Sequence, residues 1–575
     1  MRLTRALPLA VLVAAAAIAT AVFVRTRPDA PPAPDSTPRG GQLVGSIRAD
    51  PRTFNKYVAR EAVVELIAML TYARLVRINR ATFEVEPWLA ERWETSADGA
   101  THTLHLRSGV SWSDGTPFTS ADVVFSMEAA FDPRTPTVPG STLAIDGQPL
   151  RAVAVDAETV TIVYPRAFGP GIRLLDNLPI LPKHKLEAAL RDGTFAEAWN
   201  TKTPPSEIAG LGPFVLREYQ PGQRLVFERN PHYWRKAPDG RPLPYLDRIV
   251  LEIAPDQNTE LLRLTSGGID LTQSELRPED YPAIKQAASE GRLSLVELGI
   301  GTDADAFWFC LKPEVKRLDP RWAFVQKAEF RQAISHAVQR TRFADLVFLG
   351  AGVPVWGPIT PGNTPWYSEN IRTYEWSYDL AREKLASIGL IDRDGDHYVE
   401  DEHGTRASFT VLTQQGITAY ERGTAQLKYE LMQVGIDLII APLEFNTMIE
   451  RMLASNYDAM YFRPSASDLD PALNQDFWLS SGSAHFWNLS QTTPATEWEA
   501  EIDRLMREQT SVLDQARRRA LFEQVQRIFS EQLPVLYFAA PRIYYAQSAR
   551  VHGATPSVLR PPVLWNADSL TMSAF

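Results

Sequence analysis

The chain has 575 residues, a hydrophobic fraction of 45% and a formal net charge of −10. At about 150 residues per domain, this length predicts roughly three or four domains with buried cores. The negative charge argues against a nucleic-acid-binding protein, because phosphate contacts require clustered Lys and Arg. The longest basic run, Arg517-Arg518-Arg519, is expected to form an exposed face of a helix.

The N-terminal segment is expected to direct export. Two arginines precede an uncharged run from Ala6 to Val24, and Ala19-Thr20-Ala21 offers the small residues that a signal peptidase requires. Residues 1–24 are therefore a cleaved signal peptide or, if uncut, an anchor long enough to span a bilayer. Residues 25–39 form a Pro-rich linker. No cysteine follows the signal, so we expect a periplasmic protein that is not a lipoprotein and is tethered to the inner membrane only if uncut.

Strand-like and helical runs alternate between residues 41 and 253. Such mixing of the periods 2 and 3.6 predicts an α/β protein. The expected elements are strands at 41–47, 101–110 and 159–165, and helices at 61–75 and after Asp122.

The stretch 109–126, GVSWSDGTPFTSADVVFS, predicts a strand end, a turn and a helix start. Its first residues alternate apolar and polar side chains, and Asp114-Gly115 tolerates the positive φ of a tight turn. Thr119 or Ser120 then caps a helix, with Asp122 in the position of a capping-box acid. The unit contains no catalytic side chain.

From residue 212 the pattern continues and then repeats as a second large lobe. The strands Phe214–Tyr219 and Arg224–Arg229 flank Pro221-Gly222, which suits a hairpin turn. Cys310 is the only cysteine, and its apolar surroundings predict a small buried strand residue. The further expected elements are strands at 248–256, 306–311, 407–413, 437–443 and 534–546, and helices at 258–266, 327–348, 419–434 and 496–531.

Motifs for catalysis, cofactors and metals are absent from the sequence. There is no Gly-x-Ser-x-Gly, no His-Glu-x-x-His and no Gly-Lys dipeptide, which excludes a Walker A loop. The acidic stretch 392–404 fails as a calcium loop, because His397 and His403 occupy the places of the required Gly and Glu. A turn at Asp394-Gly395 is the better interpretation. We therefore expect no enzyme, no cofactor and no metal site.

Four long blocks, at 87–126, 212–234, 330–341 and 427–440, resemble the oligopeptide and dipeptide ABC-transporter solute-binding proteins, extracellular solute-binding protein family 5. The resemblance runs from about Gly40 to the C-terminus. It implies a periplasmic-binding-protein type II-like α/β fold of two lobes with an extra domain and a hinge-closing cleft. It places the crossings between lobes near Gly299–Asp303 and Gln532–Val535, and gives domain I as 40–73, 211–299 and 536–575, domain II as 74–210, and domain III, the second lobe, as 300–535.

The resemblance also places a ligand-binding segment at 461–478, YFRPSASDLDPALNQDFW, in which Asp470-Pro471 fits the family pattern. Peptide-binding members hold the ligand's ammonium group with an aspartate three residues earlier, where this chain has Ser467. Asp468 replaces that carboxylate only after a one-residue shift in register. Arg463 offers a fork for a carboxylate or phosphate, or pairs with a nearby acid.

The other candidate ligand contacts include two tryptophans that could instead belong to the protein core. Trp308 and Trp356 lie near the expected cleft, but core packing is the favoured interpretation of each of them. Gln414 and Gln415 follow a strand at a place where the family often contacts ligand. The predicted ligand-binding set is Arg463, Ser465, Ser467, Asp468, Asp470, Trp308, Gln414, Gln415 and Trp356.

The resemblance implies a non-catalytic, monomeric binding component that captures peptides or a peptide-like solute outside the inner membrane for import. Its partners are then an inner-membrane permease and separate ATPase subunits. The alternative is a sensory or chaperone-like exported binding protein for a non-peptide solute, since a fold does not fix its use. An exported enzyme is disfavoured by the missing motifs.

Overall fold

The computed structural model describes residues 37–466 and 468–573. The predicted signal or anchor at 1–24, most of the Pro-rich linker, and Ser467 lie outside the described residues. Within the described part of the chain, no helix combines the length and the apolar character needed to cross a membrane.

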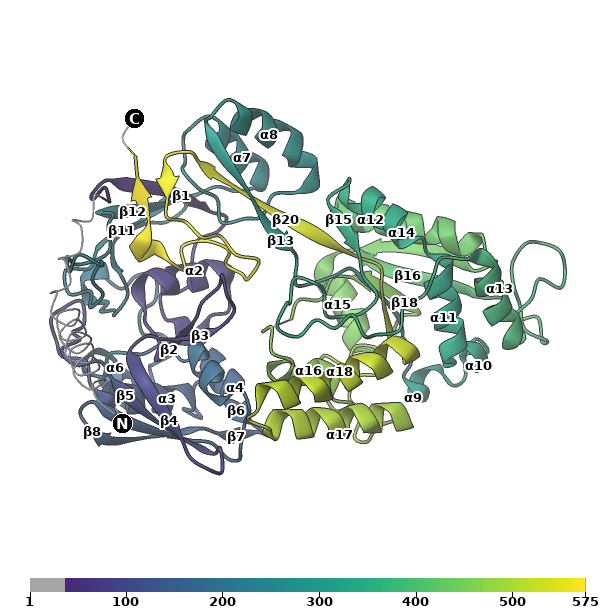
Figure 1. The fold of residues 1–575 in the computed structure, drawn as a ribbon, viewed down its shortest axis with the longest axis horizontal. Coiled ribbons are helices and arrows are strands. Elements are labelled where there is room, and N and C mark those ends of the chain that lie inside the picture. Colours follow the sequence, from purple (N-terminus) through teal and green to yellow (C-terminus); the bar gives the residue numbers. More distant parts are fainter. Residues whose placement is uncertain (1–36, 467, 574–575) are drawn as a thin grey trace, which may run out of the picture.

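The described chain forms two lobes of mixed α/β structure, as Figure 1 shows. The first lobe contains a four-stranded sheet in the order β1-β12-β11-β10, in which only β1 and β12 run parallel. The predicted hairpin is confirmed as β10 and β11, with Gly222 at a φ of 72° in the turn. The bounds are β1 Gln42–Ile47, β10 Phe214–Gln220, β11 Arg224–Arg229, β12 Arg248–Ile253, α2 Ala62–Thr71, α7 Gln257–Thr265 and α8 Tyr281–Ser289.

An extra domain adjoins this sheet and carries an antiparallel sheet in the order β4-β5-β9-β8. The capping box at Thr119 and Asp122 is confirmed at the start of α3. The strand expected before it is reduced to one bridge between Ser111 and Pro117, while Trp112 is buried and donates to Asp122. The bounds are β2 Val76–Ile78, β3 Val85–Pro87, β4 Ala90–Thr95, β5 Thr101–Leu106, β8 Arg151–Asp156, β9 Thr159–Val163, α3 Ser120–Ala130, α5 Gly171–Leu174 and α6 Lys183–Asp192.

The second lobe has a five-stranded sheet in the order β17-β16-β18-β14-β19. Both faces are buried: Phe307 and Phe309 of β14 pack on one side, and Ala306 and Trp308 pack on the other. This two-sided burial explains why β14 reads as a continuous apolar run. The strands are β14 Ala306–Phe309, β16 Ser408–Gln414, β17 Asp437–Leu443, β18 Ala459–Phe462 and β19 Val535–Tyr537. The helices are α11 Ala328–Ala337, α12 Arg340–Phe348, α13 Tyr378–Ser387 and α14 Thr418–Met432 on the first face, and α15 Phe445–Leu453, α17 Glu497–Ser511 and α18 Gln515–Gln532 on the second.

Two long antiparallel strands join the lobes (Figure 1). β13, Leu293–Ile300, pairs with β20, Ala539–Ser548, which also pairs with β15, Gly352–Pro354. The crossing expected near Gly299 coincides with the end of β13. Val535, in contrast, pairs with Trp308 inside the second lobe, so the other connection is made later, by β20. The domain boundaries themselves stay predictions.

Two helices predicted as single are each divided. The helix expected at 327–348 breaks at Val338, whose ψ of 117° is extended, and restarts as α12. The buried guanidinium of Arg340 fills this break by donating to the carbonyls of Ser335 and Val355. The helix expected at 496–531 breaks before Asp514, which caps α18 by accepting from the backbone N–H of Arg517 at 2.7 Å.

Candidate ligand-binding site

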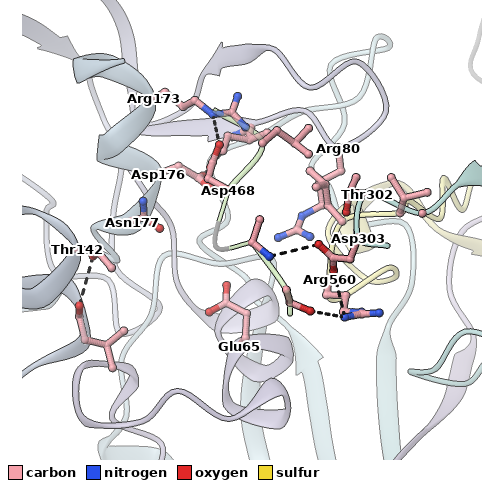
Figure 2. Close-up of a pocket in the computed structure, with 18 of the residues that line it drawn as sticks. Glu65, Arg80, Thr142, Arg173, Asp176, Asn177, Thr302, Asp303, Asp468 and Arg560 are labelled. Carbon is pink, nitrogen blue, oxygen red and sulfur yellow. Dashed lines mark hydrogen bonds and ion pairs between the residues drawn. The ribbon is translucent and has the colours of Figure 1, made fainter. Parts of the chain in front are cut away.

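A cavity of about 350 Å³ lies between the lobes and beside the connecting strands (Figure 2). Its walls contain many charged side chains of both signs. The first lobe and extra domain supply Lys56, Glu65, Arg74, Arg80, Arg173 and Asp176; the connecting region supplies Glu275, Thr302, Asp303 and Ile543; the second lobe supplies Arg463, Ser465, Ala466, Asp468 and Leu469; and the C-terminal segment supplies Val558, Leu559 and Arg560.

The wall formed by α2 is a compact ion cluster. The Glu65 carboxylate lies 2.9 Å from the Lys56 ammonium and 2.7 Å from the Arg74 guanidinium. Burial alone would raise the pKa of Glu65, but the charges of Arg74 and Lys56 lower it to about 2. Glu65 is therefore ionised at neutral pH and fixes two cations at the cavity wall.

Contacts between side chains close the cavity across the lobes. Arg173 follows the start of α5 and donates from Nε to Oδ1 of Asp468 at 2.8 Å (Figure 2). Arg560 donates from Nη1 to Oγ of Ser465 at 3.2 Å and lies 3.8 Å from Asp303. Burial raises the pKa values of Asp468 and Asp303, while Arg173 and Arg560 oppose that rise. These contacts therefore join the two lobes across the cavity.

The guanidinium of Arg463 already holds a carboxylate. Its Nη2 and Nε atoms lie 2.7 and 2.8 Å from Oδ1 of Asp305, a residue with no exposed surface. Tyr461 donates to the other carboxylate oxygen of Asp305 at 2.7 Å. Of the two interpretations of Arg463, pairing with a nearby acid is the one observed. Its fork is therefore neutralised, although the side chain lines the cavity.

Asp470 is a structural residue in this arrangement. It is buried, and Arg518 clamps its carboxylate with hydrogen bonds of 2.9 and 2.5 Å. Its Oδ1 also accepts from the backbone N–H of Ala472. Asp470 is not among the described residues that line the interlobe cavity. The same ion pair corrects the expected exposed face at 517–519, since Arg518 is buried.

Four other predicted contacts also lie away from this cavity, whose described lining contains none of them. Trp308 is completely buried, donates to Tyr457 and stacks on Phe486, so its role is core packing. Trp356 packs against the helices of the first face. Gln414 and Gln415 lie at the end of β16, where Leu443 of β17 pairs with Gln414 and bonds to Gln415.

The structure thus brings together Arg463, Ser465 and Asp468 from the predicted set, while Ser467 lies outside the described residues. Arg80, Arg173, Asp303 and Arg560 are cavity residues that sequence reasoning did not identify. They come from segments far apart in the chain, and no local motif marks them.

Two further hollows adjoin the cavity. One, of about 280 Å³, shares Asp303, Ser465 and Asp468 with it and extends into the second lobe toward the aromatic rings of Phe477, Trp478 and Phe486. The other is a groove of about 1040 Å³ between the extra domain and α18. Of these three spaces among the described residues, the 350 Å³ cavity is the one that combines the charged wall on α2 with residues next to the strands that connect the lobes. It is therefore the best candidate for a site that lobe closure completes.

The acidic loop at 392–404 forms a turn, as predicted. Asp392, Asp394 and Glu400 have carboxylate oxygens within 4.8 Å of one another. The Asp392 oxygens accept from the backbone N–H groups of Gly395 and His397, and Glu400 accepts from that of Arg393. These carboxylates are therefore engaged by the loop's own backbone.

Comparison with known proteins assigns the family. The model of bacterial extracellular solute-binding proteins, family 5 Middle, matches residues 84–486. A probable ABC transporter-binding protein of Deinococcus radiodurans is 26% identical, with 90% of each chain covered. The dipeptide-binding protein of Escherichia coli is 26% identical, covering 89% of this chain and 91% of its own.

A solved structure shares the fold. The ABC transporter substrate-binding protein CtaP of Listeria monocytogenes superposes with a TM-score of 0.76 at 22% identity, covering 93% of this chain and 99% of its own. The family match covers well over half of the sequence and includes the cavity segment at 463–469. The chain therefore belongs to family 5 of the bacterial extracellular solute-binding proteins.

Proposed function

We propose that this protein captures short peptides or a peptide-like solute outside the inner membrane and delivers them for import. The observation that carries the proposal is the interlobe cavity, whose charged groups of both signs suit a zwitterionic solute. Its volume of about 350 Å³ favours a short ligand over a long one. Similarity to a dipeptide-binding protein supports the same ligand class.

Binding without catalysis is part of this proposal. Each acidic side chain of the cavity is held in an ion pair, which suits recognition better than proton transfer. The one thiol is unsuited to nucleophilic attack, because burial raises the pKa of Cys310. Delivery then requires partners: a permease in the inner membrane and separate ATPase subunits. We propose a periplasmic monomer as the form that meets them.

Lobe closure gives the proposal its mechanism. The Arg173–Asp468 and Arg560–Ser465 contacts join the lobes directly and exist only when the lobes are together. A ligand that adds contacts to both walls shifts the protein toward this closed form. A permease that favours the open form then releases the ligand.

The test is a thermal-shift titration with a pooled library of dipeptides and tripeptides. The wild-type protein is expected to gain thermal stability, because a ligand that binds only the folded state stabilises it. Ala466→Trp fills the cavity and is expected to abolish the shift. Ala454→Trp, at an exposed site beyond α15, serves as the control and is expected to keep it. A shift that survives Ala466→Trp would place the ligand elsewhere.

A further inference from the structure

The carboxylates that line the interlobe cavity all have cationic partners within the described chain. This pairing leaves no carboxylate in that set without a counter-charge. The pairs are Glu65 with Lys56 and Arg74, Asp176 with Arg74 at 4.0 Å, Glu275 and Asp303 with Arg560, and Asp468 with Arg173.

Arg80 is the exception among the cations of the cavity. Its guanidinium points into the cavity in Figure 2. The guanidinium donates from Nη1 to the backbone carbonyl of Pro561 at 3.1 Å. Among the described residues, no carboxylate oxygen lies within 4.0 Å of this guanidinium. The neighbouring Arg77, in contrast, donates to the Glu86 carboxylate at 2.6 Å.

The backbone around Arg80 is fixed. Arg80 lies in the turn between β2 and β3, where the Asn79 side chain accepts from the N–H groups of Ala81 and Thr82. Ser557 donates to the backbone carbonyl of Arg80 at 2.7 Å. The backbone that carries the Arg80 side chain is therefore fixed before a ligand arrives, which reduces the entropic cost of binding.

Burial disfavours the charged form of Arg80. Burial lowers the pKa of its guanidinium, the charges of Asp176 and Glu65 oppose this shift, and the charges of Arg74 and Arg77 act in the same direction as burial. A guanidinium stays protonated under these conditions. Asp176 and Glu65 lie beyond ion-pair distance and offset the burial of Arg80 only in part, so an anion that contacts the guanidinium directly gains an ion pair that the described residues do not supply.

We infer that the ligand carries an anionic group and that Arg80 is the residue that binds it. This inference deepens the proposed function and rests on it. In a free peptide this group is the C-terminal carboxylate, which is present whatever the peptide's sequence. Arg80 then selects peptides with a free C-terminus and does not discriminate between their side chains. Arg463, for which the sequence left open a role as an anion-binding fork, does not fill this role, since its guanidinium is paired with Asp305.

Calorimetry with paired libraries tests the inference. Pooled dipeptides and tripeptides are offered once as free acids and once as C-terminal amides. The wild-type protein is expected to bind the acids about 10- to 100-fold more tightly, because a hydrogen bond to a charged group is lost in the amides. Arg80→Gln is expected to remove this preference, and Arg80→Lys to retain part of it, since Lys keeps the charge without the fork.

Arg77→Gln is the matched control. It removes a guanidinium three residues away on the same hairpin, outside the cavity lining, and is expected to keep the preference. Equal binding of acids and amides by the wild type, or a preference that survives Arg80→Gln, overturns the role of Arg80 and leaves peptide capture intact. Failure of the wild type to bind either library contradicts the proposed function itself, and the inference with it.

Discussion

Arg173 of the extra domain donates from Nε to Oδ1 of Asp468 in the second lobe at 2.8 Å. The two residues are 295 positions apart in the chain, and both line the interlobe cavity. Arg173 also donates to the backbone carbonyl of Phe83 at 2.8 Å, which fixes its orientation. This ion pair therefore links the position of the extra domain to lobe closure.

Arg173→Ala is expected to favour the open form, because it leaves the Asp468 carboxylate partly buried without its cation. Affinity for pooled short peptides should fall by about 2 kcal/mol, or roughly 30-fold. Small-angle scattering of the ligand-free protein should show a larger radius of gyration. The exposed Arg191→Ala on α6 is the control. Unchanged affinity and dimensions in Arg173→Ala would show that this contact does not hold the lobes together.

Asp470→Ala is expected to lower the free energy of unfolding by about 3–5 kcal/mol, because it strands the buried guanidinium of Arg518. Urea denaturation measures the loss. Arg517→Ala, at an exposed ion pair on the same helix, should cost less than about 1 kcal/mol. If Asp470→Ala instead weakened peptide binding without changing the free energy of unfolding, Asp470 would be a ligand-binding residue.

Trp308→Ala is expected to destabilise the protein by about 3–5 kcal/mol, because it leaves a cavity in a fully buried core. Trp356 is only partly buried, so Trp356→Ala should lower the free energy of unfolding by less than Trp308→Ala does. Denaturant unfolding of both variants provides the comparison. An equal loss in the two would contradict the core role assigned to Trp308.

The stability of the extra domain is expected to fall in acid because of the buried His102 side chain. Burial lowers its pKa to about 4, and its Nε2 atom has no hydrogen-bond partner among the described residues. The unfolded chain then binds a proton more readily, so stability is lost as the pH falls from about 6.5 to about 4, by about 3 kcal/mol in total.

His102→Phe removes this proton linkage while keeping an apolar ring beside Tyr164. The difference in unfolding free energy between the wild type and the variant should therefore change across pH 6.5 to 4 and be constant above that range. A difference that is independent of pH would show that His102 does not titrate with folding.

Local rules allowed much of the fold to be predicted from the sequence. The Pro221-Gly222 hairpin and the Thr119–Asp122 capping box depend on residues a few positions apart, and both are confirmed. The breaks in the two predicted helices were missed. At the first break, the Arg340 guanidinium donates to the carbonyl of Val355, which lies in the segment that follows α12, and no local pattern predicts this contact.

The site was predicted less well for the same reason. The fork of Arg463 was identified, but the acid that occupies it is Asp305, 158 positions earlier. Arg80 lies in an ordinary turn, and only the folded chain shows that its guanidinium faces the cavity without a carboxylate partner among the described residues. The balance of charges in a cavity depends on side chains from several distant segments, so local sequence patterns do not predict it.

Mass spectrometry of the small molecules that co-purify with the exported protein tests the central claim most directly. Native spectra give the mass added to the protein, and denaturing extraction gives the identity of the released compounds. The account predicts a mixture of dipeptides and tripeptides with free C-terminal carboxylates, lost from Ala466→Trp. A single non-peptide compound in their place, bound by the wild type and absent from that variant, would contradict peptide capture.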